Sequence, residues 1–269
     1  MKHKGKKALS PVSILYACLI YLFLYLPIFM VIVYSFNKNE TNITFSGFSF
    51  SAYEGIFEGS DLMDSLIFTL QLACYSTLIS LVLGTLATIG MYRYHFKGKS
   101  LLNNLLYVSI VIPELVIGIA SLACFTFMGF ELSLATLVIA HVTFCLPFVI
   151  ITLRARISGF DASIEEAAMD LGANQWRTLK RVTIPMLAPG IIAGAMLSFT
   201  LSIDDVVISF FVSGAGNTTF PIKVYGMARG KITTQVYAIS TVMIVGTVLI
   251  YLAAQTLQKK LEKKQIEVE

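Results

Sequence analysis

The chain has 269 residues, of which 56% are hydrophobic and only 13% are charged, and its formal net charge is +4. A soluble domain of this size carries about a quarter charged residues, so this composition excludes an ordinary soluble protein. The sequence therefore predicts an all-α integral membrane protein, and its length fits one domain.

Six apolar segments are long enough to cross a bilayer as helices. The first follows a lysine-rich stretch, and its length predicts an uncleaved helix rather than a signal peptide. The third is interrupted by Pro113 and Glu114, which predict either a kink or a new helix start. The predicted spans cover residues 12–36, 66–92, 101–127, 132–153, 186–212 and 236–257.

Basic residues concentrate in four of the polar segments, which the positive-inside rule places in the cytoplasm together with both termini. These segments are residues 1–11, 93–99, 154–181 and 259–269. Between the basic N-terminus (1–11) and the tail (259–269), residues 12–258 are predicted to form a single six-helix transmembrane domain. The remaining basic loop, 213–232, is predicted to lie outside, and we expect it to be structured and partly packed.

The longest polar interruption, at about residues 155–185, has the pattern of a helix, a turn and a second helix. Ser163 and Glu166 have the spacing of a capping box, which predicts a helix start near Ile164. Gly172 suits the left-handed position that commonly ends a helix. A second helix can begin near Asn174. Two prolines, Pro185 and Pro189, then mark the entry into the next apolar segment.

Part of this interruption resembles the EAA loop of ABC importer membrane subunits. The resemblance rests on Glu166-Ala167-Ala168, on Gly172 four positions after Ala168, and on Val182-Thr183-Ile184-Pro185 after a nine-residue gap. It implies a type I ABC importer permease fold, in which this loop docks into a groove on a separate ATP-hydrolysing subunit. The predicted coupling residues are Glu165, Glu166, Ala167, Ala168, Gly172 and Pro185. The alternative is an ordinary amphipathic helix on the membrane surface.

The chain has no nucleotide-binding loop of its own. Gly98-Lys99-Ser100 resembles the end of one, but Arg93 stands where the first glycine is required. We therefore expect a non-catalytic subunit without a cofactor, and we expect ATP and Mg²⁺ to be bound by a partner ATPase. None of the four cysteines has metal-site spacing, so no metal site is predicted.

Acidic residues within apolar segments are candidates for a substrate path, because charges at membrane depth usually face a cavity or a partner. On a continuous helix, Asp205 would extend a stripe of Ser198, Ser202 and Ser209, whereas Asp204 would lie about 100° away. Glu114 follows Pro113 and could line the same cavity. The alternative is that both aspartates are contacts between helices at a subunit seam.

One histidine also lies in an apolar segment. His141 and Cys145 are one helical turn apart, and we expect them to serve packing and hydrogen bonding, because further zinc ligands are lacking.

Carboxylates in a low-dielectric passage favour a cationic solute. Most of the chain resembles the second permease of spermidine/putrescine importers, notably LSIDDVVISFF at 201–211 and MYRYHFKGKS at 91–100. By this likeness, the substrate-path positions are Glu114, Ser202, Asp204 and Asp205. Ala52 and Gln175 depart from the pattern, since the family tends to have an aromatic residue and an acid there.

The resemblance also implies partners and a location. The partners are a second permease, two copies of an ATP-binding subunit and an extracytoplasmic polyamine-binding protein, in the plasma membrane of a bacterium; no nucleic acid is expected. Two alternatives remain. The first is an ABC permease for another solute, such as iron or thiamine. The second is a stand-alone channel, a secondary transporter or an intramembrane enzyme.

Overall fold

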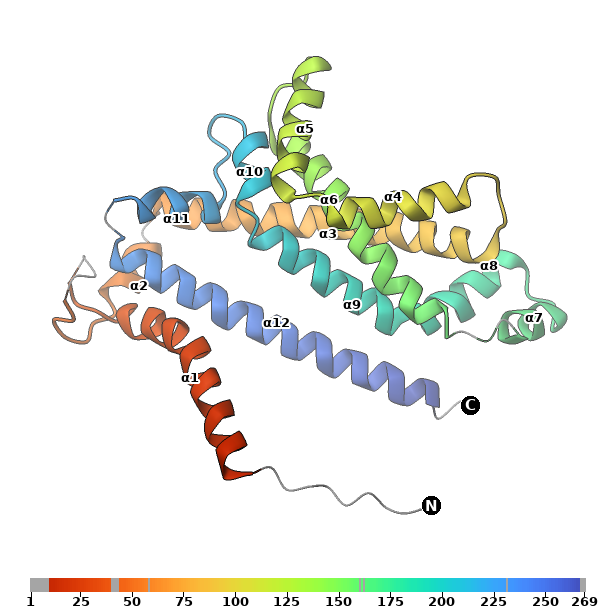
Figure 1. Cartoon of the computed structure of the whole chain (residues 1–269), viewed down its shortest axis with the longest axis horizontal. Helices are drawn as coiled ribbons and strands as arrows, with labels where there is room; N and C mark the ends of the chain where they lie inside the picture. Colours follow the sequence, from red (N-terminus) through yellow and green to blue (C-terminus); the bar gives the residue numbers. More distant parts are fainter. Residues whose placement is uncertain are drawn as a thin grey trace. The chain divides into compact units, whose positions relative to one another are not determined.

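The computed structural model describes residues 10–39, 44–57, 59–159, 161, 163–230 and 232–266 (Figure 1). Within these residues the regular structure is helical, apart from one isolated antiparallel bridge between Asn37 and Phe48. The predicted all-α class is therefore confirmed for the described part of the chain.

The chain divides into two compact units. The first comprises Met1–Met63 and Gly230–Gly246, and the second comprises Asp64–Arg229 and Thr247–Glu269. The predicted single domain over residues 12–258 stays a prediction.

The first unit contains α1 (Pro11–Tyr34), α2 (Ser51–Phe57) and the beginning of α12 (Thr234–Ile266). Helix α1 begins after Ser10, whose hydroxyl accepts a hydrogen bond from the backbone N–H of Ser13 at 3.2 Å. The helix is apolar on all sides and none of its residues is buried within the chain, as expected for a helix in lipid or against another subunit.

The segment after α1 is held by a buried asparagine. The Asn37 side chain donates to the Thr44 carbonyl at 3.0 Å and accepts from the Ser46 backbone N–H at 2.9 Å. Ala52, which departs from the family pattern, is buried in α2, directly before Tyr53. Tyr53 belongs to a cluster of aromatic rings that also includes Phe36, Phe48 and Phe50.

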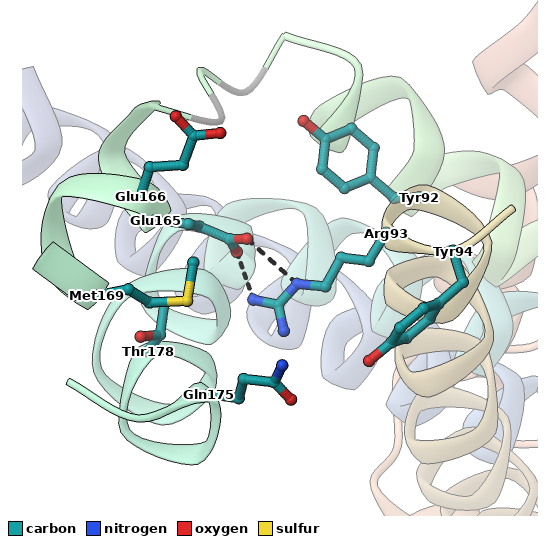
Figure 2. A pocket seen from close by; sticks show the side chains of 8 residues that line it. All are labelled: Tyr92, Arg93, Tyr94, Glu165, Glu166, Met169, Gln175 and Thr178. Atoms are coloured by element: carbon teal, nitrogen blue, oxygen red, sulfur yellow. Dashed lines mark hydrogen bonds and ion pairs between the residues drawn. The ribbon is translucent and has the colours of Figure 1, made fainter.

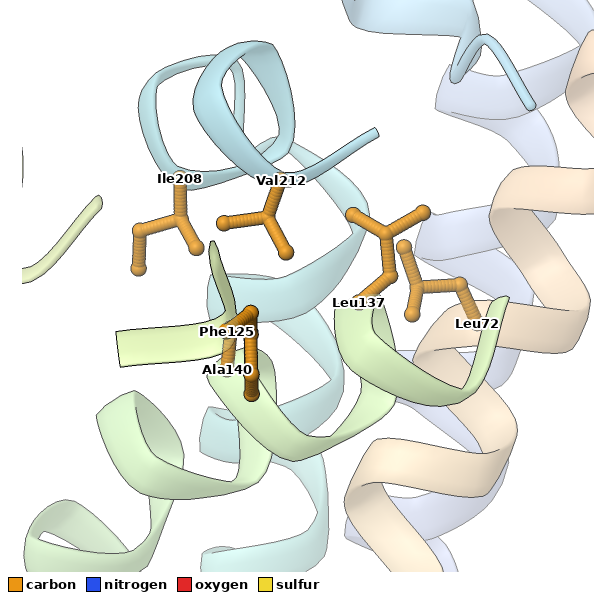
Figure 3. Packing of buried hydrophobic residues seen from close by; sticks show 6 residues of the cluster. All are labelled: Leu72, Phe125, Leu137, Ala140, Ile208 and Val212. Atoms are coloured by element: carbon orange, nitrogen blue, oxygen red, sulfur yellow. The ribbon is translucent and has the colours of Figure 1, made fainter. Parts of the chain in front are cut away.

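The second unit is built around α6 (Leu134–Ile157), which packs along α9 (Ile184–Ile203). Its core also includes side chains of α3 (Asp61–Arg93), α5 (Glu114–Phe127) and α10 (Val207–Val212) (Figure 3). The buried residues of this cluster are Leu72, Phe125, Leu137, Ala140, Ile208 and Val212.

The basic loop predicted to be structured contains α11 (Phe220–Ala228). Phe220 is buried, and its backbone N–H donates to the Thr69 hydroxyl of α3 at 2.8 Å. The Arg229 guanidinium lies over the Tyr225 ring, 5.1 Å from its centroid. The expectation of partial packing is confirmed for the described residues of this loop.

Five helices of the described chain are long and apolar enough to cross a membrane, and one bent pair raises this number to six if it counts as a span. The bent pair is α4 (Lys99–Val111) and α5, which meet at an angle of 110°. The break lies at Ile112, which is extended, and Pro113, which has no N–H to continue the helix. The sequence predicted either a kink or a new helix start in this segment, and the structure has a new helix start at Glu114.

The predicted fifth span is wrong as a single continuous helix. Helix α9 ends at Ile203, Asp204 is non-helical, and α10 begins at Val207. The break has a local cause, because the Asp205 carboxylate accepts the backbone N–H groups of Ile208 and Ser209, at 3.1 and 2.7 Å. A side-chain acceptor for these donors stabilises a new helix start without proline or glycine.

Candidate functional site

The predicted helix-turn-helix segment is present. Helix α7 (Ser163–Asp170) begins within one residue of the predicted start, but Ser163 is itself helical and does not precede the helix. The Asp161 carboxylate accepts the backbone N–H of Ser163 at 3.0 Å, an acceptor that the predicted capping box did not include. This bond favours the ionised form and lowers the pKa of Asp161.

The turn after α7 depends on Gly172, which has a φ of +87°. This is the left-handed conformation predicted for it, and few side-chain-bearing residues adopt it at low cost. The backbone N–H of Ala173 closes the turn on the Ala168 carbonyl at 3.1 Å. Asn174 then caps the next helix, accepting the backbone N–H of Arg177 at 2.9 Å.

The second helix continues into the apolar segment without a break. It runs from α8 (Gln175–Thr178) through one π-helical stretch, η1 (Leu179–Thr183), into α9. In this wide turn the Ile184 backbone N–H donates to the Leu179 carbonyl. The next residue, Pro185, has no backbone N–H to donate. Pro185 is exposed at the start of α9.

Glu165 and Glu166, both predicted as coupling residues, have opposite environments. Glu165 is buried and points toward Arg93 at the end of α3, whereas Glu166 is exposed and points away from it (Figure 2). The Arg93 guanidinium donates from Nε and Nη2 to the two Glu165 oxygens, at 3.1 and 2.6 Å. Nη2 also donates to the Thr183 hydroxyl at 2.8 Å.

The sequence did not identify Arg93 as a functional residue. It appeared there only as one of the basic residues that place segment 93–99 in the cytoplasm. Its partner Glu165 is 72 positions away, and no local spacing links the two. Of the predicted coupling acids, the structure therefore leaves Glu166 exposed for contact with another molecule.

A pocket of about 500 Å³ opens beside this ion pair. Its lining residues come from the end of α3, from α7 and from α8 (Figure 2), and they are Tyr92, Arg93, Tyr94, Glu165, Glu166, Met169, Gln175 and Thr178. Large apolar side chains stand exposed on the same segment, with Leu171 91% and Trp176 71% exposed. Exposed apolar groups next to a polar hollow are typical of a protein interaction surface.

The second candidate site lies where α9 ends and α10 begins. His141 of α6 is fully buried, with Nδ1 2.8 Å from the Ser202 hydroxyl and Nε2 3.1 Å from the Ser209 hydroxyl. Its Nε2 is also 3.3 Å from the Asp205 carboxylate. The expectation that His141 serves hydrogen bonding is confirmed, and Cys145 donates to the Ser198 carbonyl at 3.6 Å.

The four residues predicted for the substrate path differ in solvent exposure. Asp205 and Ser202 are buried, and each has a partner in the His141 network. Asp204 is exposed, and its backbone N–H closes the last turn of α9 on Thr200. Glu114 is half-buried at the start of α5, near the Asp205 side chain. The structure thus brings all four predicted residues to one place, with Asp204 and Glu114 the accessible carboxylates.

The sequence matches, over residues 80–266, the family described as "Binding-protein-dependent transport system inner membrane component". The chain is 35% identical over 241 residues to the spermidine/putrescine transport system permease protein PotC of Haemophilus influenzae, covering 90% of this chain and 94% of that relative. It is 32% identical over 264 residues to the putrescine transport system permease protein PotI of Escherichia coli strain K12, covering 96% and 94%.

The fold also has relatives among solved structures. A chain of a bacterial ABC transporter involved in the import of the acidic polysaccharide alginate superposes with a TM-score of 0.72, covering 93% of this chain and 99% of that chain. The two sequences are 17% identical, so this likeness concerns the fold alone. It agrees with the predicted type I importer fold.

Proposed function

The chain belongs to the family of inner membrane components of binding-protein-dependent transport systems, and we propose that it forms half of the translocation path of an ATP-driven polyamine importer. As a permease component it is non-catalytic, and ATP hydrolysis with its Mg²⁺ belongs to a partner subunit.

The observation that carries the polyamine proposal is the group of acids at the break between α9 and α10. Asp204 and Glu114 place accessible carboxylates beside the buried Asp205. In a passage of low dielectric, such a group attracts a polyammonium ion and repels an anion. Relatives that share about a third of this sequence are named for spermidine and putrescine, which supports the same solute class.

Within this group we assign separate roles. Asp204 and Glu114 contact the passing cation, because they are the accessible acids. Asp205 and Ser202 act indirectly, by fixing the helices that line the path. The Asp205 carboxylate caps α10, and the Asp205 and Ser202 side chains both contact His141 of α6. We therefore propose an indirect role for Ser202 and Asp205, which were predicted to lie on the substrate path.

The segment from α7 to η1 is proposed as the coupling site for the ATPase. Glu166 and Ala167 are exposed there and Ala168 is partly exposed, while Pro185 is exposed just beyond it, at the start of α9. Alanines let a partner surface approach closely, and Glu166 offers an ionic contact. Gly172 fixes the turn that presents these residues.

The proposed assembly contains a second permease, two ATPase subunits and an extracytoplasmic polyamine-binding protein. The excess of Lys and Arg in residues 1–11, 93–99, 154–181 and 259–269 supports cytoplasmic termini and a cytoplasmic coupling segment. Closure of the ATPase pair would then alternate access to the path, which should hold the polyamine only weakly so that release follows.

The test is uptake of spermidine and putrescine into proteoliposomes that contain the full complex. We expect uptake that requires both ATP and the binding protein. Uptake of either polyamine without the ATPase would favour a stand-alone channel or secondary transporter. If no polyamine were taken up and ATP hydrolysis were stimulated instead by a binding protein loaded with iron or thiamine, the result would favour an ABC permease for that solute.

A further inference from the structure

Two helical elements of the proposed coupling segment, α7 and η1, meet the end of α3 at one arginine. Arg93 is the last residue of α3, Glu165 lies in the first turn of α7, and Thr183 is the last residue of η1 before α9. The guanidinium contacts both side chains, and the Thr183 hydroxyl in turn donates to the Glu165 carboxylate. The three side chains therefore form a closed triangle of hydrogen bonds (Figure 2 shows the Arg93–Glu165 side).

The geometry of this triangle differs from that of an ordinary surface ion pair. The arginine engages both carboxylate oxygens through separate N–H groups, so that the relative orientation of the two groups is fixed. Their side chains are 20% and 12% exposed, which limits screening by water. An exposed pair would contribute little to the position of its helices, whereas a shielded bidentate pair can hold them.

We propose that Arg93 is a positioning residue for energy coupling, which fastens α7 to the ends of α3 and α9 so that a displacement of α7 is carried into both. This inference rests on the proposed coupling role of α7. In this role Arg93 neither binds ATP nor touches the polyamine. It acts by holding Glu165, and it thereby leaves the adjacent Glu166 as the exposed acid for the ATPase.

A purely stabilising contact makes a different prediction from a coupling contact. If the triangle only stabilised the fold, its loss would lower the amount of assembled complex and leave the transport per ATP of the remaining complex unchanged. If it transmits motion, its loss lowers the solute moved per ATP hydrolysed in complexes that still assemble. The ratio of uptake to hydrolysis therefore separates the two roles.

The experiment compares Arg93→Met, Arg93→Lys, Thr183→Val and the charge swap Arg93→Glu with Glu165→Arg in the full complex in proteoliposomes. The matched control is Lys97→Met, which removes an exposed charge from the same connection. We expect Arg93→Met to retain the ATPase subunit and to lower the uptake-to-hydrolysis ratio about tenfold, within the range typical of coupling between sites.

The other variants set the scale of the effect. Arg93→Lys keeps the charge but lacks the planar fork that bonds the two carboxylate oxygens from separate nitrogens. Thr183→Val removes both hydrogen bonds of the Thr183 hydroxyl at nearly constant volume but leaves the Arg93–Glu165 ion pair, so both variants should lower the ratio less. The charge swap should recover part of the ratio, and Lys97→Met should leave it unchanged.

Two results would overturn the proposal. One is a wild-type ratio in Arg93→Met, and the other is a loss of assembled complex in this variant with neither an altered ratio nor recovery by the swap. If Glu166→Lys also left assembly and uptake at wild-type level, the coupling function of the segment would itself be wrong. If Arg93→Met gave one of these two results while Glu166→Lys lost uptake, only the role of Arg93 would be rejected, and the coupling function of the segment would stand.

Discussion

At the scale of single residues, adjacent acids have different environments because the backbone changes direction between them. Asp204 directly follows the last residue of α9 and is exposed, whereas Asp205 is buried and accepts two backbone N–H groups of α10. His141 completes the buried side of this arrangement. The difference in exposure between the two aspartates is therefore a consequence of the helix break.

We predict that His141→Ala destabilises the protein by about 2–3 kcal/mol, because buried polar partners lose their hydrogen bonds. The measurement is thermal unfolding of the purified subunit or complex in detergent. Thr143→Val on the same helix is the matched control, since Thr143 is exposed and bonds only its own helix among the described contacts. An equal loss of stability in both variants would contradict the role given to His141.

A second residue-scale prediction concerns the pairing of His141 with Asp205. Each single change, His141→Ala and Asp205→Asn, should destabilise, and the double variant should cost less than the sum of the two. The same unfolding measurement on all four proteins gives the coupling energy. Additive effects would show that the two side chains act independently.

At the scale of elements, the turn at Gly172 and the contact of α5 with α10 each depend on a glycine, for different reasons. Gly172 needs its positive φ, although a side chain there would meet open space. At Gly118, by contrast, an added Cβ would lie 2.9 Å from the Phe211 ring and 3.4 Å from the Ile208 Cα. Glycine is therefore required at position 172 by the left-handed backbone, and at position 118 by the close approach of α10 to α5.

We predict that Gly172→Val destabilises the end of α7 by about 1–2 kcal/mol or more, the cost of a left-handed residue. The coupling segment should then be cut faster by a protease, and ATP-driven uptake should fall while the protein still inserts. Gly159→Ala is the control, because its backbone is not left-handed and its nearest neighbour would be 3.8 Å away. Unchanged cleavage and uptake in Gly172→Val would contradict the turn assignment.

Gly118→Leu should separate α5 from α10 and destabilise the protein by about 1–3 kcal/mol through overpacking. Because α5 carries Glu114 and α10 begins beside Asp205, uptake should fall as well. The control is Gly226→Leu on α11, where an added Cβ meets no atom within 4 Å. Equal stability of the two variants would show that the contact is not tight.

The first, second, fourth and sixth apolar segments form single long helices as hydropathy predicted, because burial in lipid requires long apolar runs whatever their contacts. The break at Pro113 was also predictable, since proline cannot donate to the preceding turn. The break at Asp204 was not, because it depends on a carboxylate bonding N–H groups three and four residues later, without proline or glycine. The Arg93–Glu165 pair was missed for the related reason that its partners are distant in sequence.

At the scale of the whole molecule, two groups of charged residues carry the proposed function. The acids beside the α9–α10 break form the proposed polyamine path, and the segment from α7 to η1 forms the proposed contact with the ATPase. Helix α9 connects the two groups, since it follows η1 directly and ends at Ile203, next to Asp204. A shift of the coupling segment would therefore reach the acids along a single continuous element.

The proposed polyamine path depends on the accessible carboxylates at the α9–α10 break. The most direct measurement is ATP-dependent uptake of spermidine and putrescine by proteoliposomes holding the full complex with Asp204→Asn. Because loss of one charge in a low-dielectric passage weakens cation binding substantially, we predict uptake about tenfold lower with ATPase assembly and stability unchanged. Uptake equal to that of the wild type, measured with the same amount of intact complex, would contradict the claim.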